Sequence, residues 1–126
     1  MGTKRMSLGK WGEDRALEYL ENEGLSLRDR NWRGHHKELD LVMETPLKLH
    51  IIEVKTLRAP SPIDPWEHVT RTKQSALIAA AGQYVAENHI HKEIQFDIVS
   101  ILVAPDGVNF DLRYIPEAFF PIYFTH

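Results

Sequence analysis

Cysteine is absent from this sequence of 126 residues, and no apolar run is long enough to cross a membrane. Without cysteine the chain can form neither a disulfide nor a zinc site with thiolate ligands, which fits a reducing compartment. The opening segment MGTKRMSLGKWGED also lacks the apolar centre of a secretory signal. Together these absences predict a cytoplasmic protein that does not act on membranes.

The sequence has no large excess of charge of either sign, and its formal net charge is −3. This value argues against a protein that coats DNA without specificity, because such binding needs many phosphate-neutralising cations. It does not exclude a nuclease, since active-site acids lower the net charge and a bound metal ion reverses it locally. The length and the 43% hydrophobic content predict a single domain over residues 1–126 with one core.

Hydrophobic periodicity predicts helices over residues 7–22 and from 66 or 69 to 88. Apolar or alternating segments predict strands at 25–32, 38–44, 47–55, 94–103 and 108–115. Three prolines indicate a loop over 57–66, and residues 116–120 are expected to form a helical turn. The order α-β-β-β-α-β-β predicts an α/β protein with a mixed central sheet flanked by helices.

Two carboxylates and a lysine fall on two neighbouring predicted strands. Side chains alternate along a strand, so Glu53 and Lys55 share one face, and a hairpin brings Asp40 beside Glu53. Charged groups cost too much desolvation to serve as ordinary core residues. Mg²⁺ takes oxygen ligands from one or two carboxylates, and a lysine can orient water and offset phosphate charge. We interpret these residues as a divalent-cation site for phosphodiester hydrolysis; the alternative is an exposed sheet edge that carries a salt bridge.

A basic stretch leads into the strand at 38–44. Its side chains could follow a nucleic-acid backbone beside the site, or they could form a solvated strand edge. The sequence leaves both readings open. Interrupted only by Asp29, the stretch consists of Arg28, Arg30, Arg33, His35, His36 and Lys37.

Two aromatic features also have alternative readings. Trp66, in the proline-rich loop, is the best candidate among the tryptophans for a substrate contact, whereas Trp11 and Trp32 suit the core. The apolar tail at 119–124 either covers the core or forms a docking or dimer surface. Of these two interpretations, we favour a tail that covers the core.

Several motifs, taken together, resemble a known family. The pair Glu38-Leu39-Asp40 and Glu53-Val54-Lys55 resembles the core of PD-(D/E)XK nucleases. With the helical pattern GEDxAxxYL at 12–20, RNxR at 30–33 and FDI at 96–98, it is similar to the YraN-like family of bacterial proteins. That family is in turn similar to archaeal Holliday junction resolvases. The resemblance implies a restriction-endonuclease-like fold and metal-dependent chemistry on nucleic acid.

The resemblance also implies roles for individual residues. Asp40 and Glu53 become ligands of Mg²⁺ or Mn²⁺, together with the backbone carbonyl of Val54, and Lys55 becomes the catalytic lysine. Glu13 becomes a further acid that reaches the metal directly or through water. The nucleic acid is expected to meet basic side chains at Arg30, Arg33, Lys37 and Lys73. The chain departs from the family pattern at Lys37, Gln95 and Ser75, where glycine, arginine and another basic residue are usual.

The leading hypothesis is therefore a Mg²⁺- or Mn²⁺-dependent endonuclease-like protein that hydrolyses phosphodiesters in branched or damaged DNA. One alternative is a non-catalytic nucleic-acid-binding module. Another is a homodimerising interaction domain with a preserved nuclease fold. A homodimer is expected only by analogy with junction resolvases. The sequence does not separate DNA from RNA, although the resemblance favours DNA.

Overall fold

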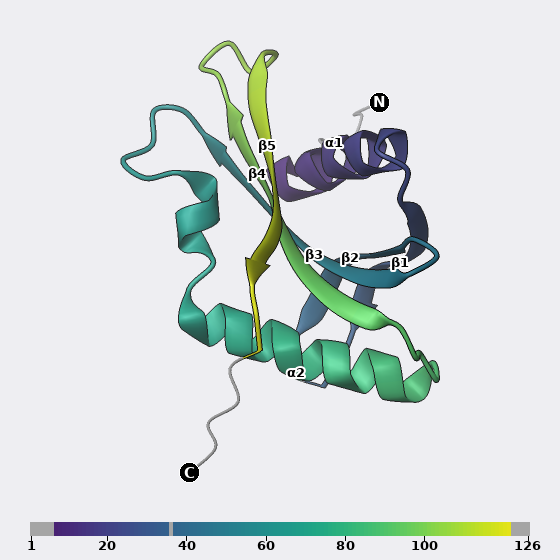
Figure 1. The fold of residues 1–126 in the computed structure, drawn as a ribbon. Helices are drawn as coiled ribbons and strands as arrows, with labels where there is room; N and C mark the ends of the chain where they lie inside the picture. Colours follow the sequence, from purple (N-terminus) through teal and green to yellow (C-terminus); the bar gives the residue numbers. More distant parts are fainter. Residues whose placement is uncertain (1–6, 36, 122–126) are drawn as a thin grey trace, which may run out of the picture.

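The computed structural model describes residues 7–35 and 37–121 (Figure 1). His36 of the basic stretch, and Tyr123 and Phe124 of the predicted tail, lie outside these residues. One five-stranded sheet has the order β1-β2-β3-β4-β5, with helices on both faces. The elements are α1 (Leu8–Asn22), β1 (Ser26–Arg33), β2 (Glu38–Glu44), β3 (Lys48–Arg58), the 3₁₀ helix η1 (Pro65–His68), α2 (Arg71–Glu87), β4 (Glu93–Val103) and β5 (Phe110–Phe119).

The predicted order α-β-β-β-α-β-β is confirmed, and the arrangement is consistent with a restriction-endonuclease-like fold. Strands β3 and β4 are parallel, and the other neighbouring pairs are antiparallel. The parallel pair requires a crossover, which η1 and α2 provide. Strand β3 therefore occupies the centre of the sheet, so the interpretation of Glu53 as part of an exposed edge is wrong. No helix in the described parts of the chain has the length and hydropathy of a membrane span.

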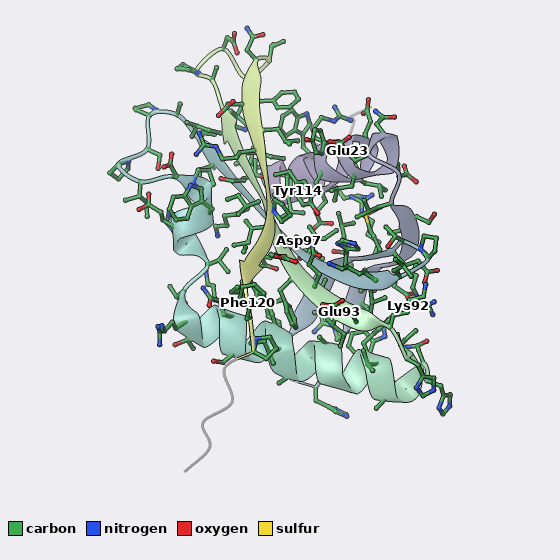
Figure 2. The ribbon with its side chains drawn as sticks, in the orientation of Figure 1. Glu23, Lys92, Glu93, Asp97, Tyr114 and Phe120 are labelled. Carbon is green, nitrogen blue, oxygen red and sulfur yellow. The ribbon has the colours of Figure 1, made fainter. Side chains whose placement is uncertain are left out.

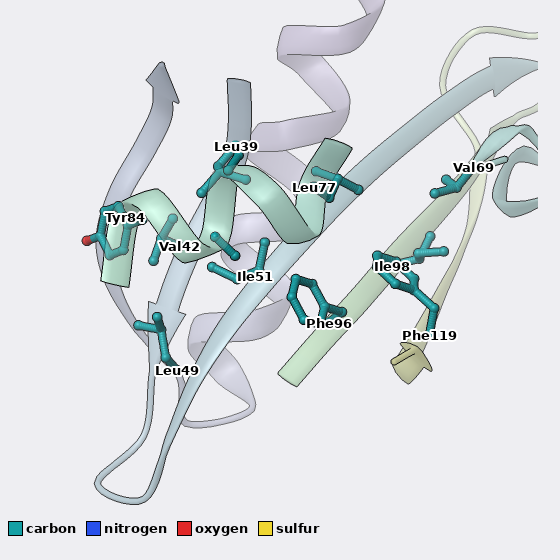
Figure 3. Packing of buried hydrophobic residues seen from close by; sticks show 12 residues of the cluster. Leu39, Val42, Leu49, Ile51, Val69, Leu77, Tyr84, Phe96, Ile98 and Phe119 are labelled. Atoms are coloured by element: carbon teal, nitrogen blue, oxygen red, sulfur yellow. The ribbon is translucent and has the colours of Figure 1, made fainter. Parts of the chain in front are cut away.

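The sheet separates two clusters of buried apolar side chains. The α2-side core joins Leu77 and Tyr84 of α2 to strand residues such as Ile51 and Phe96 (Figure 3). Trp32 packs against this core, as expected from the sequence. The α1-side core consists of Ala16, Leu20, Leu41, Met43, Ile52, Val99, Ile101 and Val103, with Trp11 packed against it.

Helix α1 approaches β3 closely through a glycine. Ser7 caps the helix by accepting a hydrogen bond from the Lys10 N–H at 3.1 Å. Near the first turn, a side chain on Gly12 would overlap the Thr56 hydroxyl of β3. The absence of a Cβ therefore lets α1 lie against the strand that carries Glu53, and brings Glu13 to the same region.

We expect Gly12→Ala to destabilise the protein by about 1–3 kcal/mol, because the added methyl overpacks the α1–β3 contact. Gly82→Ala is the matched control, since Gly82 lies in α2 with nothing within 4 Å of an added Cβ. That control should stabilise the helix by about 0.5–1 kcal/mol. Urea unfolding measures both changes, and a Gly12→Ala variant as stable as Gly82→Ala would refute the close approach.

The helical turn predicted over residues 116–120 is wrong, because β5 continues to Phe119. The pairs Ile98↔Ile115 and Phe96↔Phe119 enclose extra residues of β5, so the strand bulges at this point. Glu117 has a φ of 50° within the bulge, and its N–H donates to Asp97 rather than to a ladder carbonyl. The buried Asp97 side chain thus takes the place of a backbone carbonyl as the acceptor for Glu117. Hydrophobic periodicity alone does not predict this replacement.

Two further boundaries differ from the expected ones. The helix expected from residue 66 or 69 is divided into η1 and α2, and Thr70 caps α2 by accepting from the Lys73 N–H at 3.3 Å. At the end of β5, Phe119 is buried and stacks on Phe96 with ring centroids 5.2 Å apart. This part of the predicted tail covers the core, whereas Phe120 is 63% exposed.

Candidate active site

The candidate site lies where β2 and β3 separate. The ladder between these strands runs from Glu44↔Leu49 to Leu41↔Ile52 and stops there. Beyond it, Asp40 Oδ2 accepts a hydrogen bond from the Val54 N–H at 2.9 Å. The carboxylate thus replaces a backbone partner for Val54 at the point where β2 and β3 separate, which we call the fork.

Glu53 and Lys55 project from β3 on the face covered by α2. Ile51, two residues before Glu53, belongs to the α2-side core, and alternate residues of a strand share a face. Glu53 is 7% exposed, whereas Lys55 is partly exposed. Within the described residues, Lys55 takes part in no ion pair. Its ammonium group is therefore available to a ligand.

Asp40 and Glu53 form an electrostatically coupled pair. Burial raises the pKa of Asp40 to about 8, and the neighbouring charge of Glu53 adds to this increase. The Val54 N–H and the charge of Lys37 oppose it. Glu53 Oε1 is buried and has no hydrogen-bond partner within the described residues. Two adjacent carboxylates, one with an unsatisfied oxygen, provide the hard donor atoms that a divalent cation prefers.

Among the described residues, Lys37 contacts Glu53 of this pair. Its Nζ lies 3.4 Å from Glu53 Oε2, and its side chain is partly buried. The resemblance assigns the catalytic role to Lys55, and the basic stretch led us to expect Lys37 on phosphate. The structure places Lys37 on Glu53 Oε2, so in the absence of a metal ion this lysine balances the charge of the buried carboxylate.

Glu13 lies near Asp40 without joining a three-acid cluster. Arg30, which contacts Glu13, is the register partner of Leu41, the residue after Asp40. Burial raises the pKa of Glu13, and the charge of Asp40 raises it further. Over residues 7–35 and 37–121, no group of three or more histidine, aspartate or glutamate side chains is arranged to hold a metal ion. Arg30 holds Glu13 in place: Nε lies 3.4 Å from Glu13 Oε1, and Nη2 lies 2.6 Å from Asp14 Oδ1.

The predicted nucleic-acid-binding residues thus fall into different environments. Arg30 and Lys37 are paired with acids of the site region. Arg33 has a side chain that is 82% exposed, and it pairs with Glu38 at 3.4 Å. Lys73 is partly buried in the first turn of α2.

A buried polar network lies apart from these residues, and sequence reasoning did not find it. Asp97 is fully buried, and its Oδ2 lies 2.7 Å from His50 Nδ1 and 2.8 Å from the Tyr114 hydroxyl. Asp97 and Tyr114 lie next to each other within the sheet (Figure 2). The other carboxylate oxygen, Oδ1, accepts from Gln95 Nε2 and from the Glu117 N–H, both at 2.9 Å. The sequence feature that could have indicated this network is Asp97 itself, a single aspartate within the apolar run of β4.

Burial alone would raise the pKa of Asp97, but hydrogen bonds from His50, Gln95, the Glu117 N–H and Tyr114 outweigh it. The pKa of Asp97 is consequently held below its usual value. Burial, and then the bond to Asp97, raises the pKa of the Tyr114 hydroxyl. All four donors bind the same carboxylate, and one of them is the Glu117 N–H in the bulge of β5. The network therefore stabilises the bulge and leaves no carboxylate oxygen free for a ligand.

We expect Asp40→Asn to stabilise the metal-free protein. The raised pKa means that the folded protein holds a proton that the unfolded chain releases, so stability falls as pH rises from about 4 to about 8. Asparagine cannot ionise and can still accept from the Val54 N–H. Because the residue is partly accessible to water, the gain at about pH 8 should be about 2 kcal/mol rather than the full converted shift.

Urea unfolding in a chelating buffer measures this gain at both ends of the pH range. Glu38→Gln is the control, since its carboxylate lies on the same strand but pairs with the exposed Arg33. It should leave the pH dependence unchanged. An Asp40→Asn variant that follows the wild-type pH dependence would show that the pKa of Asp40 is not raised in the folded protein.

Comparison with known proteins finds one family, and its members match most of the length of this chain. The model of the family described as "Uncharacterised protein family UPF0102" matches residues 12–101, which include all the predicted site residues. A UPF0102 protein from Bacteroides fragilis is 40% identical over 114 residues, covering 90% of this chain and 93% of that protein. One from Syntrophotalea carbinolica is 38% identical over 120 residues, covering 94% of this chain and 96% of that protein. One from Rhodococcus opacus is 34% identical over 115 residues, covering 90% of this chain and 97% of that protein.

Proposed function

Because this chain belongs to the UPF0102 (YraN-like) family and places Asp40 beside Glu53, we propose that it is a metal-dependent endonuclease-like protein. Its substrate would be the phosphodiester backbone of DNA, with branched or damaged DNA preferred, and it would act in the cytoplasm. The single observation that carries the proposal is the coupled carboxylate pair, with Lys55 on the same strand as Glu53.

The donor atoms at the fork fit a Mg²⁺ or Mn²⁺ ion. Asp40 and Glu53 would hold it, and Glu53 Oε1 is a buried oxygen with no hydrogen-bond partner among the described residues. The Val54 carbonyl would contribute as well, because it points to the same strand edge as the Val54 N–H, which bonds Asp40. When bound, the ion would supply electrostatic stabilisation to phosphate oxygens and acidify water.

The surrounding side chains have distinct roles under this proposal. The Lys55 ammonium would orient the attacking water and donate hydrogen bonds to phosphate oxygens as their charge increases. Lys37 would neutralise Glu53 in the metal-free protein, and it would be released to bind phosphate once a divalent cation takes over that charge. Arg30 would keep Glu13 close to the site without occupying it.

A cleavage screen tests the proposal. Wild-type protein and Glu53→Gln, purified identically, would be incubated with Mn²⁺ and single-stranded, duplex, flapped and four-way-junction DNA, with matched RNA. We expect cleavage by the wild type alone, and the substrate cut fastest identifies the substrate class. Equal cleavage by both proteins would point to a contaminant. No cleavage by either would reject the enzyme proposal and favour a binding module.

A further inference from the structure

A cavity of about 640 Å³ lies on the α2 side of the sheet, next to the candidate site. Its walls come from η1, the start of α2, β4 and β5, and it is lined by residues that include Trp66, Gln74, Ile98, Arg113, Ile115 and Ala118. This volume is within the range of about 300–1,000 Å³ that is typical of small-ligand sites. None of these residues has a role in the hydrolysis proposed above.

Strand register connects the cavity to the candidate site. Glu53 is the partner of Ile98, which is the partner of Ile115, so the three positions form one row across β3, β4 and β5. Lys55, Ser100 and Arg113 form the next row on the same face of the sheet. Neighbouring strands lie about 4.8 Å apart, so each cavity residue on β5 is about 10 Å from its counterpart on β3. Ile51 and Ile98 both belong to the α2-side core, so the cavity lies on the same face as Glu53.

Trp66 is held at the edge of this row by its backbone. Its N–H donates to Ser100 Oγ at 3.1 Å, between the positions of Lys55 and Arg113. Element η1, which carries Trp66, contacts both β3 and β4. Trp66 is 37% exposed, so its backbone is anchored while its side chain remains partly accessible to a ligand.

The lining combines an aromatic ring and apolar side chains with a few polar groups. Ile98 and Ile115 provide apolar walls, and Gln74 provides an amide whose Nε2 donates to the Val69 carbonyl at 3.1 Å. Glu67 adds one carboxylate, whose Oε2 accepts from the Asp64 N–H at 2.6 Å. Within the described residues, the guanidinium of Arg113 takes part in no ion pair. A flat ligand with polar edges, attached to a phosphate, matches this set of groups.

We propose that the cavity takes an unpaired nucleobase whose backbone reaches the candidate site. The base would stack on Trp66 between the isoleucine walls, Gln74 would meet its polar edge, and Arg113 would pair with an adjoining phosphate. A base inside a duplex cannot expose its face to such a wall without leaving the stack. The preferred substrate is therefore DNA with a single-stranded or locally unpaired nucleotide.

This inference rests on the proposed function for the identity of the ligand, but its test measures binding alone. Fluorescein-labelled oligothymidylate and a fully paired duplex would be titrated with protein in a chelating buffer, where no cleavage occurs. We expect Trp66→Ala to weaken single-strand binding about tenfold and to leave duplex binding unchanged. Trp66→Phe should retain most of the affinity, because a phenyl ring can still stack.

Phe110→Ala is the matched control, since Phe110 is similarly exposed at 42% but packs against Trp11 on the α1 side. A second variant, Ala118→Phe, fills the cavity from β5 and should give the same loss without removing the tryptophan. Near-ultraviolet circular dichroism verifies that each variant is folded. The inference is overturned if Trp66→Ala or Ala118→Phe binds both DNAs as the wild type does, or loses affinity for both equally.

The two proposals can fail separately. Cleavage by the wild type without a Trp66-dependent preference for single strands would overturn the base-pocket inference and leave the nuclease proposal intact. Single-strand binding that depends on Trp66, in a wild type that cleaves nothing with Mn²⁺, would support the pocket and reject the nuclease.

Discussion

Lys55→Ala is expected to lower the rate of Mn²⁺-dependent DNA cleavage by about 10²- to 10³-fold, the usual cost of losing one donor to a developing charge. The Lys55 ammonium shares the face of Glu53 and is not engaged in an ion pair with any described residue. Its contribution would arise in the transition state rather than in metal binding. Single-turnover rates should therefore fall while the affinity for Mn²⁺ stays nearly unchanged.

Further variants test whether this predicted effect is specific to Lys55. Lys55→Arg keeps the charge and should recover part of the rate, whereas Lys92→Ala removes a lysine that pairs with Glu44 at 2.8 Å and should have no effect. Lys37→Ala should reduce the rate less than Lys55→Ala, because Lys37 pairs with Glu53 in the metal-free protein. A larger loss in Lys37→Ala than in Lys55→Ala would reassign the catalytic role to Lys37.

Asp97→Ala is expected to destabilise the protein by about 3–5 kcal/mol, a large part of the roughly 5–15 kcal/mol that folded domains possess. The carboxylate is fully buried and receives hydrogen bonds from four donors on β3, β4 and β5. Its removal leaves those donors buried without partners, which costs more than losing the bonds themselves. The bulge of β5 at Glu117 should loosen at the same time.

Asp106→Ala is the matched control for this loss. Its carboxylate also accepts backbone hydrogen bonds, from Val108 at 2.8 Å and Asn109 at 2.9 Å, but it lies in an exposed turn. We expect a cost of about 1 kcal/mol from that variant in urea unfolding. Equal losses in the two variants would contradict a special role for the buried network.

The acid limb of the stability curve tests the same network. Because the pKa of Asp97 is lowered in the folded protein, its contribution is present above about pH 4 and is lost as pH falls below that value. Asp97→Ala should therefore reduce the acid sensitivity of the folded state.

The element order and the carboxylate pair could be predicted from the sequence because both depend on local pattern. The alternation along β3 places Glu53 and Lys55 on one face, and the short hairpin brings Asp40 alongside. The end of β5 could not be predicted, since Pro116 opposes a regular strand and the compensating bond comes from Asp97, 20 residues earlier. The pairing of Lys37 with Glu53 could not be predicted from the sequence either, because the two residues are 16 positions apart and their contact depends on where β2 and β3 separate.

The separation of Arg30 from the remaining basic stretch has a local cause that only the structure reveals. Asn31 has a φ of 54°, a conformation unusual in a strand, and Arg30 and Trp32 on either side of it reach opposite faces. Arg30 accordingly meets Glu13 of α1, whereas Trp32 packs in the α2-side core. Strict alternation would have placed both side chains on one face.

The measurement that tests the central claim most directly is a calorimetric titration of Mn²⁺ into four proteins: wild type, Asp40→Asn, Glu53→Gln and the control Glu38→Gln. The account predicts that the wild type and Glu38→Gln bind with the same Kd. It also predicts that each of the other two variants binds at least about tenfold more weakly, since each loses one charged ligand of a site built from two. Equal affinity in all four proteins would contradict the assignment of Asp40 and Glu53 as the metal site.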